Sequence, residues 1–165
     1  MDTNLLYFFL STFIFAIIFG FLESEVEKDK GWGSGFNPNR WFAKVSPVNK
    51  LLPIGDLYGN IPLLNYHIIL AFIFFPLVII FSAYFFHIYN IFYVIASYTI
   101  TVSAEDFSWF VLNRHMHSFR ELTKGPNGQI FWIRDWTRVG NFYVPRQYIF
   151  SIITAVVLIF LGMKL

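Results

Sequence analysis

The chain has no cysteine among its 165 residues. This absence excludes disulfide bonds, thiolate metal sites and cysteine nucleophiles. Charge is also scarce, because Asp, Glu, Lys and Arg supply 13% of the residues, against about 25% in soluble domains. The formal net charge of +2 is too small to favour nucleic acid as a partner, and the sequence has no basic helix or RNA-binding aromatic motif.

The chain is rich in apolar residues instead. Hydrophobic residues make up 56% of the sequence, and Phe alone supplies 22 residues. A soluble fold of this size would leave large apolar patches exposed to water. Lipid is the simplest solvent for such a surface, and the length fits one domain. The composition therefore predicts a single membrane domain over residues 1–165, with the lipid bilayer as a partner.

Four apolar runs have about the length of membrane-spanning helices. They cover residues 4–22, 66–86, 91–113 and 147–163. No Lys or Arg precedes the first run and no Ala-x-Ala site follows it, so we expect a retained span rather than a signal peptide. Pro76 lies near the middle of the second run and predicts a kink. The predicted fold class is all-α, a polytopic membrane protein with four transmembrane helices and two long cytoplasmic loops.

Positive charges indicate the orientation. The loop between the first two predicted spans has five Lys or Arg residues and the loop between the last two has six: Lys28, Lys30, Arg40, Lys44 and Lys50, then Arg114, Arg120, Lys124, Arg134, Arg138 and Arg146. The opposite side carries Lys164. Because Lys and Arg favour the cytoplasmic side, we expect both long loops in the cytoplasm and both termini outside.

Two adjacent acids, Glu105 and Asp106, lie within the third apolar run. A charge at the bilayer centre costs about 3 kcal/mol or more, so an intramembrane carboxylate is a functional-site hypothesis by default. The predicted topology places Glu105 roughly 21 Å along its helix, past the midplane toward the cytoplasm. Other polar residues reach a similar depth. The candidate polar site at the cytoplasmic edge of the bundle comprises Glu23, Glu27, His67, Glu105, Asp106, Trp109 and Asn113.

One interpretation of these acids is electrostatic. Buried acids pair with basic residues by necessity. Four arginines are candidates to neutralise Glu23, Glu105 and Asp106 and so to fix the bundle: Arg40, Arg114, Arg134 and Arg146. The protein would then be an accessory structural subunit of a larger membrane complex, with other membrane subunits as partners.

A second interpretation is a binding site. Carboxylates with His suit a divalent transition metal such as iron, manganese or zinc, although neither Glu-x-x-His nor His-Glu-x-x-His occurs. The candidate metal ligands are Glu105, Asp106, His67, His115 and His117. The alternative occupant is a lipid headgroup or quinone-like ligand, with four aromatic residues as walls: Trp109, Phe110, Trp132 and Trp136. In a catalytic version of this site, Glu105 or Asp106 would act as a general base on a membrane-dissolved substrate.

Several segments resemble a family of small uncharacterised prokaryotic integral membrane proteins. The resemblance rests on Glu23-x-x-x-Glu27-x-x-x-Gly31-Trp32, Tyr66-His67, Glu105-Asp106-Phe107-x-Trp109-Phe110-x-Leu112-Asn113, Trp132-x-x-x-Trp136 and Pro145-x-x-Tyr148, in this order. A His commonly follows the first Trp of the fourth segment in that family, whereas Ile133 stands here. The resemblance implies the membrane architecture and the choice of site, and it implies no activity. We expect the protein to lie in the plasma membrane of a prokaryote.

The leading hypothesis is therefore a small multi-pass membrane protein with an acidic and His-containing site at the cytoplasmic edge of the bundle, which binds a metal ion or a polar or lipid ligand. A transporter is disfavoured, because four spans without a detectable internal repeat rarely enclose a gated path.

Overall fold

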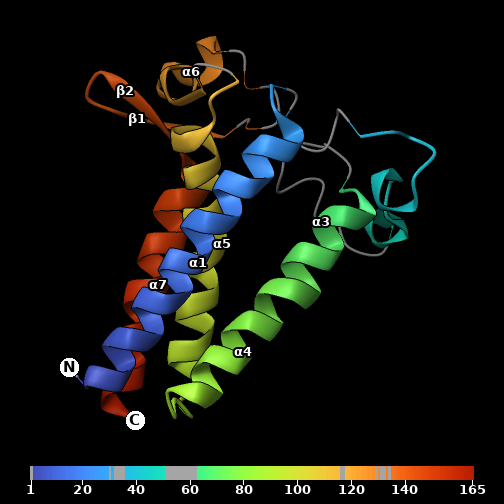
Figure 1. The fold of residues 1–165 in the computed structure, drawn as a ribbon. Coiled ribbons are helices and arrows are strands. Elements are labelled where there is room, and N and C mark those ends of the chain that lie inside the picture. Colours follow the sequence, from blue (N-terminus) through green and yellow to red (C-terminus); the bar gives the residue numbers. More distant parts are fainter. Residues whose placement is uncertain are drawn as a thin grey trace.

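The computed structural model describes residues 2–29, 31, 36–50, 63–115, 118–128, 130, 133 and 135–165. This part of the chain is mostly helical (Figure 1). The long helices are α1 (Thr3–Glu27), α5 (Ile91–Leu112), α7 (Arg146–Lys164) and a continuous helix made of α3 (Asn65–Ile69), the π-helical turn η3 (Leu70–Phe74) and α4 (Phe75–Phe85). The shorter elements are η1 (Trp41–Ala43), η2 (Pro47–Lys50), α6 (Ser118–Lys124), η4 (Gly125–Asn127), β1 (Trp136–Val139) and β2 (Phe142–Pro145).

Three of these helices are long and apolar enough to cross a membrane: Thr3–Glu27, Asn65–Phe85 and Arg146–Lys164. Their outer faces expose large aliphatic and aromatic side chains, for example Ile18, Phe81 and Val156. The central helix α5 is not one of the three. It has the predicted length, but it carries Thr101, Glu105 and other polar residues along its buried face.

A stripe of small residues brings α1 and α5 together. Thr12, Ala16, Gly20 and Ser24 recur every four residues along the buried face of α1, a spacing that allows close approach of membrane helices. A Cβ on Gly20 would overlap the backbone oxygen of Glu105, so only Gly fits there. This contact fixes the backbone of α5 against α1 at the level of its acidic pair.

The sequence predicts a kink at Pro76, and the structure has a π-helical turn just before this residue. The amide of Phe75 bonds to the carbonyl of Leu70, five residues back. Pro76 has no N–H to offer, so the Ala71 carbonyl loses its partner within the helix. The hydroxyl of Tyr98 on α5 donates to that oxygen at 2.8 Å. A π-helical turn, satisfied from a neighbouring helix, thus precedes Pro76 without ending the helix.

The all-α prediction is wrong for the second long loop. Strands β1 and β2 form an antiparallel hairpin, with Trp136 opposite Pro145 and Val139 opposite Phe142. Gly140 adopts φ +60° in the two-residue turn, a conformation that Gly adopts without steric cost. The predicted turn at 125–128 is present as η4 and the residue that follows it.

Helices α1 and α7 both pack against α5, while α4 contacts α1 and α5 through the half that ends near residue 85 (Figure 1). The α3 end of the same helix leans away from the bundle. Both termini lie at the same end of the molecule as the turn between α4 and α5, and the two long loops begin and end at the opposite end. The divergence of α3 leaves room for a cavity beside α5.

Candidate functional site: an acidic cavity

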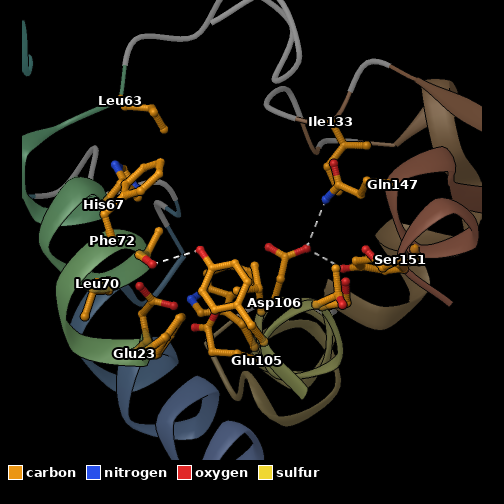
Figure 2. A pocket seen from close by; sticks show the side chains of 18 of the residues that line it. Glu23, Leu63, His67, Leu70, Phe72, Glu105, Asp106, Ile133, Gln147 and Ser151 are labelled. Carbon is orange, nitrogen blue, oxygen red and sulfur yellow. Dashed lines mark hydrogen bonds between the residues drawn. The ribbon is translucent and has the colours of Figure 1, made fainter. Parts of the chain in front are cut away.

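A cavity of about 330 Å³ lies between α3 and η3 on one side and the start of α7 on the other, with α1 and α5 completing it (Figure 2). Its polar lining comes from α1, α3, α5 and α7: Glu23, Glu27, His67, Tyr98, Thr99, Ser103, Glu105, Asp106, Trp109, Gln147, Tyr148 and Ser151. Its apolar lining consists of Leu63, Leu70, Ala71, Phe72, Phe75, Val102 and Ile133. We call it the acidic cavity. Its volume is at the lower end of the range for small-molecule sites, about 300–1,000 Å³.

Glu105 and Glu23 meet where α5 crosses α1. The two carboxyl groups come within hydrogen-bonding reach of each other, and the hydroxyl of Tyr66 donates to Oε1 of Glu23. Glu105 is only 7% exposed. Its Oε1 atom has no hydrogen-bond partner in the described part of the chain. A buried polar atom without a partner is costly, so this oxygen favours a donor, either a proton shared with Glu23 or a group that enters the cavity.

Asp106 faces the opposite side of the cavity from Glu23 (Figure 2). Its Oδ2 atom accepts hydrogen bonds from the hydroxyl of Tyr148 at 2.5 Å and from Nε2 of Gln147 at 3.4 Å. Both donors belong to the first turn of α7, directly after the hairpin. The ring of Phe107 packs edge-on against Tyr148. The adjacent acids therefore contact different neighbours, Glu105 toward α1 and Asp106 toward α7.

His67 lines the cavity from α3, and its tautomer can be assigned. The amide N–H of Leu64 donates to Nδ1 at 3.1 Å, so in the neutral ring the hydrogen resides on Nε2. This bond also fixes the first turn of α3. With Nδ1 engaged and Nε2 carrying hydrogen, neutral His67 presents a donor rather than a lone pair.

The described lining is strongly unbalanced in charge. It contains four carboxyl groups, those of Glu23, Glu27, Glu105 and Asp106, and no Lys or Arg. Ionised carboxylates that share a buried site repel one another. Bound protons or a positively charged group would balance them, whereas a phosphate or carboxylate headgroup would add to the repulsion.

The electrostatic interpretation expects an arginine paired with Glu23, Glu105 or Asp106. No such ion pair occurs within the described residues. Arg114 instead lies 3.8 Å from the carboxylate of Glu25 and stacks over the ring of Phe21. Arg40 and Arg146 are exposed. Arg134 falls outside the described residues.

Several predicted site residues lie elsewhere. The amide of Asn113 donates to the backbone oxygen of Lys28 at 2.7 Å, joining the ends of α1 and α5. His115 lies 3.4 Å from the carboxylate of Glu25, away from the cavity lining. Phe110 is packed in an apolar core with Leu122. His117 and Trp132 lie outside the described residues.

Trp109 lines the cavity, whereas Trp136 packs against the neighbouring apolar core and donates from Nε1 to the Ile133 oxygen at 3.0 Å. For the metal hypothesis, no group of three or more His, Asp or Glu side chains placed to hold an ion occurs among the residues that the structure describes.

The sequence interpretation missed the partners of the acids. Tyr66, Tyr98, Gln147 and Tyr148 all contribute to the site or its walls. A signal was present in the last of the apolar runs, where Gln147, Tyr148 and Ser151 share one helical face through their spacing. These are the residues that α7 presents to the cavity.

No protein-family model, curated protein or solved structure matches this chain. The site is therefore interpreted from its own geometry.

Proposed function

We propose that the chain crosses the membrane four times, with α5 as the fourth span. Helices α4 and α7 both run toward the end of the molecule where the two termini lie (Figure 1). Helix α5 connects the end of α4 to the segment that leads into α7, so it must run back over the same length. Its polar face packs against α1 and α7, which shields it from lipid.

The orientation that supports this proposal follows from charge. The end that carries the two long loops holds most Lys and Arg residues, so it faces the cytoplasm by the positive-inside rule. The acidic cavity then lies at the cytoplasmic edge of the bundle. The membrane proposed is the plasma membrane of a prokaryote, in keeping with the family resemblance.

The function proposed is the binding of a polar or amphiphilic ligand in the acidic cavity. The observation that carries it is a buried carboxylate oxygen of Glu105 without a partner among the described residues, in the wall of a cavity large enough for a small molecule. The apolar lining from η3 and α4 suits the hydrocarbon part of such a ligand. Intramembrane carboxylates commonly mark sites of this kind.

The test is to identify what the protein retains. The detergent-purified chain is analysed by native mass spectrometry, and bound molecules are extracted and identified. Val102→Trp fills the apolar part of the cavity and is expected to remove the bound molecule. The control Val157→Trp places the same side chain on the exposed face of α7 and should leave occupancy unchanged. Equal occupancy in both folded variants would contradict the proposal.

A further inference from the structure

We propose that the ligand is an amphiphile whose head is a protonated primary amine, held between the carboxyl groups of Glu105, Glu23 and Asp106. This inference rests on the proposed function and names the chemistry of its ligand. It is carried by the arrangement of acceptors in the acidic cavity together with the absence of Lys and Arg from its described lining.

The unpaired oxygen of Glu105 is the first feature of the cavity that favours an amine. Glu105 is more than nine-tenths buried and lines the cavity, and its Oε1 atom has no partner among the described residues. A hydrogen-bond donor is needed at that point. Because Glu23 lies within reach of the same carboxyl group, a donor that also carries positive charge relieves the repulsion between the two acids.

The number of acceptors in the cavity also favours a primary ammonium group. A primary ammonium group has three N–H donors and no acceptor. Glu23, Glu105 and Asp106 all line the cavity, with Glu23 on the α1 side and Asp106 toward α7 (Figure 2), and the proposed ammonium group would lie among their carboxyl groups. Asp106 accepts hydrogen bonds from Gln147 and Tyr148 through Oδ2, so its other oxygen can face the amine. A quaternary ammonium group lacks the N–H donors that this arrangement requires.

The apolar wall of the cavity indicates the chemistry of the rest of the ligand. Next to the acids, the cavity wall is formed by Leu70, Ala71, Phe72, Phe75 and Val102. These side chains cannot hydrogen-bond, and they favour a hydrocarbon chain. A phosphate beside the amine would meet the carboxyl groups of Glu23 and Asp106 without a Lys or Arg from the described lining. The amine is therefore attached to an apolar chain rather than to a phosphodiester.

The experiment compares four probes on the full-length, detergent-purified protein by native mass spectrometry: dodecylamine, dodecanol, dodecyltrimethylammonium and propylamine. Charged hydrogen bonds in a buried site discriminate strongly, so we expect dodecylamine to bind about tenfold or more tightly than dodecanol. Glu105→Gln keeps the shape of the side chain and should abolish that preference. Glu25→Gln removes an acid outside the cavity and should leave the preference intact.

The outcomes separate this inference from the proposed function. If dodecanol binds as well as dodecylamine and Val102→Trp displaces both, the cavity binds amphiphiles but the amine is wrong. Equal binding of the trimethylammonium probe would overturn the role of the N–H donors, and equal binding of propylamine would overturn the apolar chain. If Val102→Trp changes the binding of none of the four probes, the proposed function itself fails. Should Glu105→Gln not fold, Asp106→Asn tests the same preference, since its amide oxygen still accepts from Tyr148.

Discussion

At the scale of single residues, the acids depend on tyrosines that the apolar helices supply. Tyr148→Phe removes the hydroxyl that donates to Asp106 and changes little else. We expect it to lower the free energy of unfolding by about 1–2 kcal/mol, because a buried hydrogen bond to a carboxylate is lost. Thermal unfolding in detergent measures the effect. Tyr84→Phe, on an exposed tyrosine of α4, is the control, and an equal effect there would contradict this reading of Tyr148.

Gly20 is the second residue on which the site depends. Gly20→Ala sets a methyl group against the backbone of α5 at Glu105 and should destabilise the protein by about 1–3 kcal/mol. Gly162→Ala is the matched control. Its added carbon would lie 2.6 Å from the ring edge of Tyr93, a side chain that can shift more readily than a helix backbone. Unfolding in a denaturing detergent compares the two variants, and a greater loss for Gly162→Ala would overturn this account.

The acids themselves could be predicted from the sequence, because charge within an apolar run is conspicuous. Their partners could not be. Tyr66 and Tyr148 resemble any interfacial tyrosine until the fold places them beside Glu23 and Asp106. Asn113, by contrast, was predicted to belong to the site but does not line the cavity. It shares a helical stripe with Glu105, but it lies where α5 ends, and its amide caps the backbone of α1 instead.

At the scale of elements, the π-helical turn η3 links two residues far apart in the sequence. Tyr98→Phe leaves the Ala71 oxygen without a partner and should cost about 1–2 kcal/mol of stability. In a protein that carries Pro76→Ala, residue 76 regains its N–H, and a regular α-helical hydrogen-bond pattern can supply a donor to the Ala71 oxygen. The same Tyr98→Phe change should then cost little.

A double-mutant cycle over Tyr98 and Pro76 measures this coupling through unfolding free energies. Additive effects of the two substitutions would show that the hydroxyl does not replace the bond that proline removes. Tyr93→Phe, a tyrosine of α5 that packs by its ring against Phe9, serves as the reference and should be additive with Pro76→Ala.

The long helices could be predicted within a few residues because apolar length alone specifies them. The hairpin could not be recognised in the same way, since its residues are mixed in polarity and two strands of four residues each carry little periodicity. The pair Gly140–Asn141 between Val139 and Phe142 was the available signal, as a two-residue turn of this kind favours a hairpin.

At the scale of the whole molecule, topology is directly testable because the chain has no natural cysteine. Tyr89→Cys lies in the exposed turn between α4 and α5, and Asn39→Cys lies in the first long loop. An impermeant maleimide should label the cysteine at position 89 on intact cells and the one at position 39 only after permeabilisation. Labelling of both from outside would contradict four spans in this orientation.

The arrangement of the site has a consequence for how the protein is made. Glu23 belongs to α1, which a ribosome synthesises before α5, whereas the donors to Asp106 belong to α7, which follows α5. During translation, the acids of α1 and α5 are therefore synthesised before Gln147 and Tyr148 exist to cover them. A nascent chain halted before Arg146 would hold Asp106 without either of these donors. Insertion of α7 is thus the step of biosynthesis that completes the site.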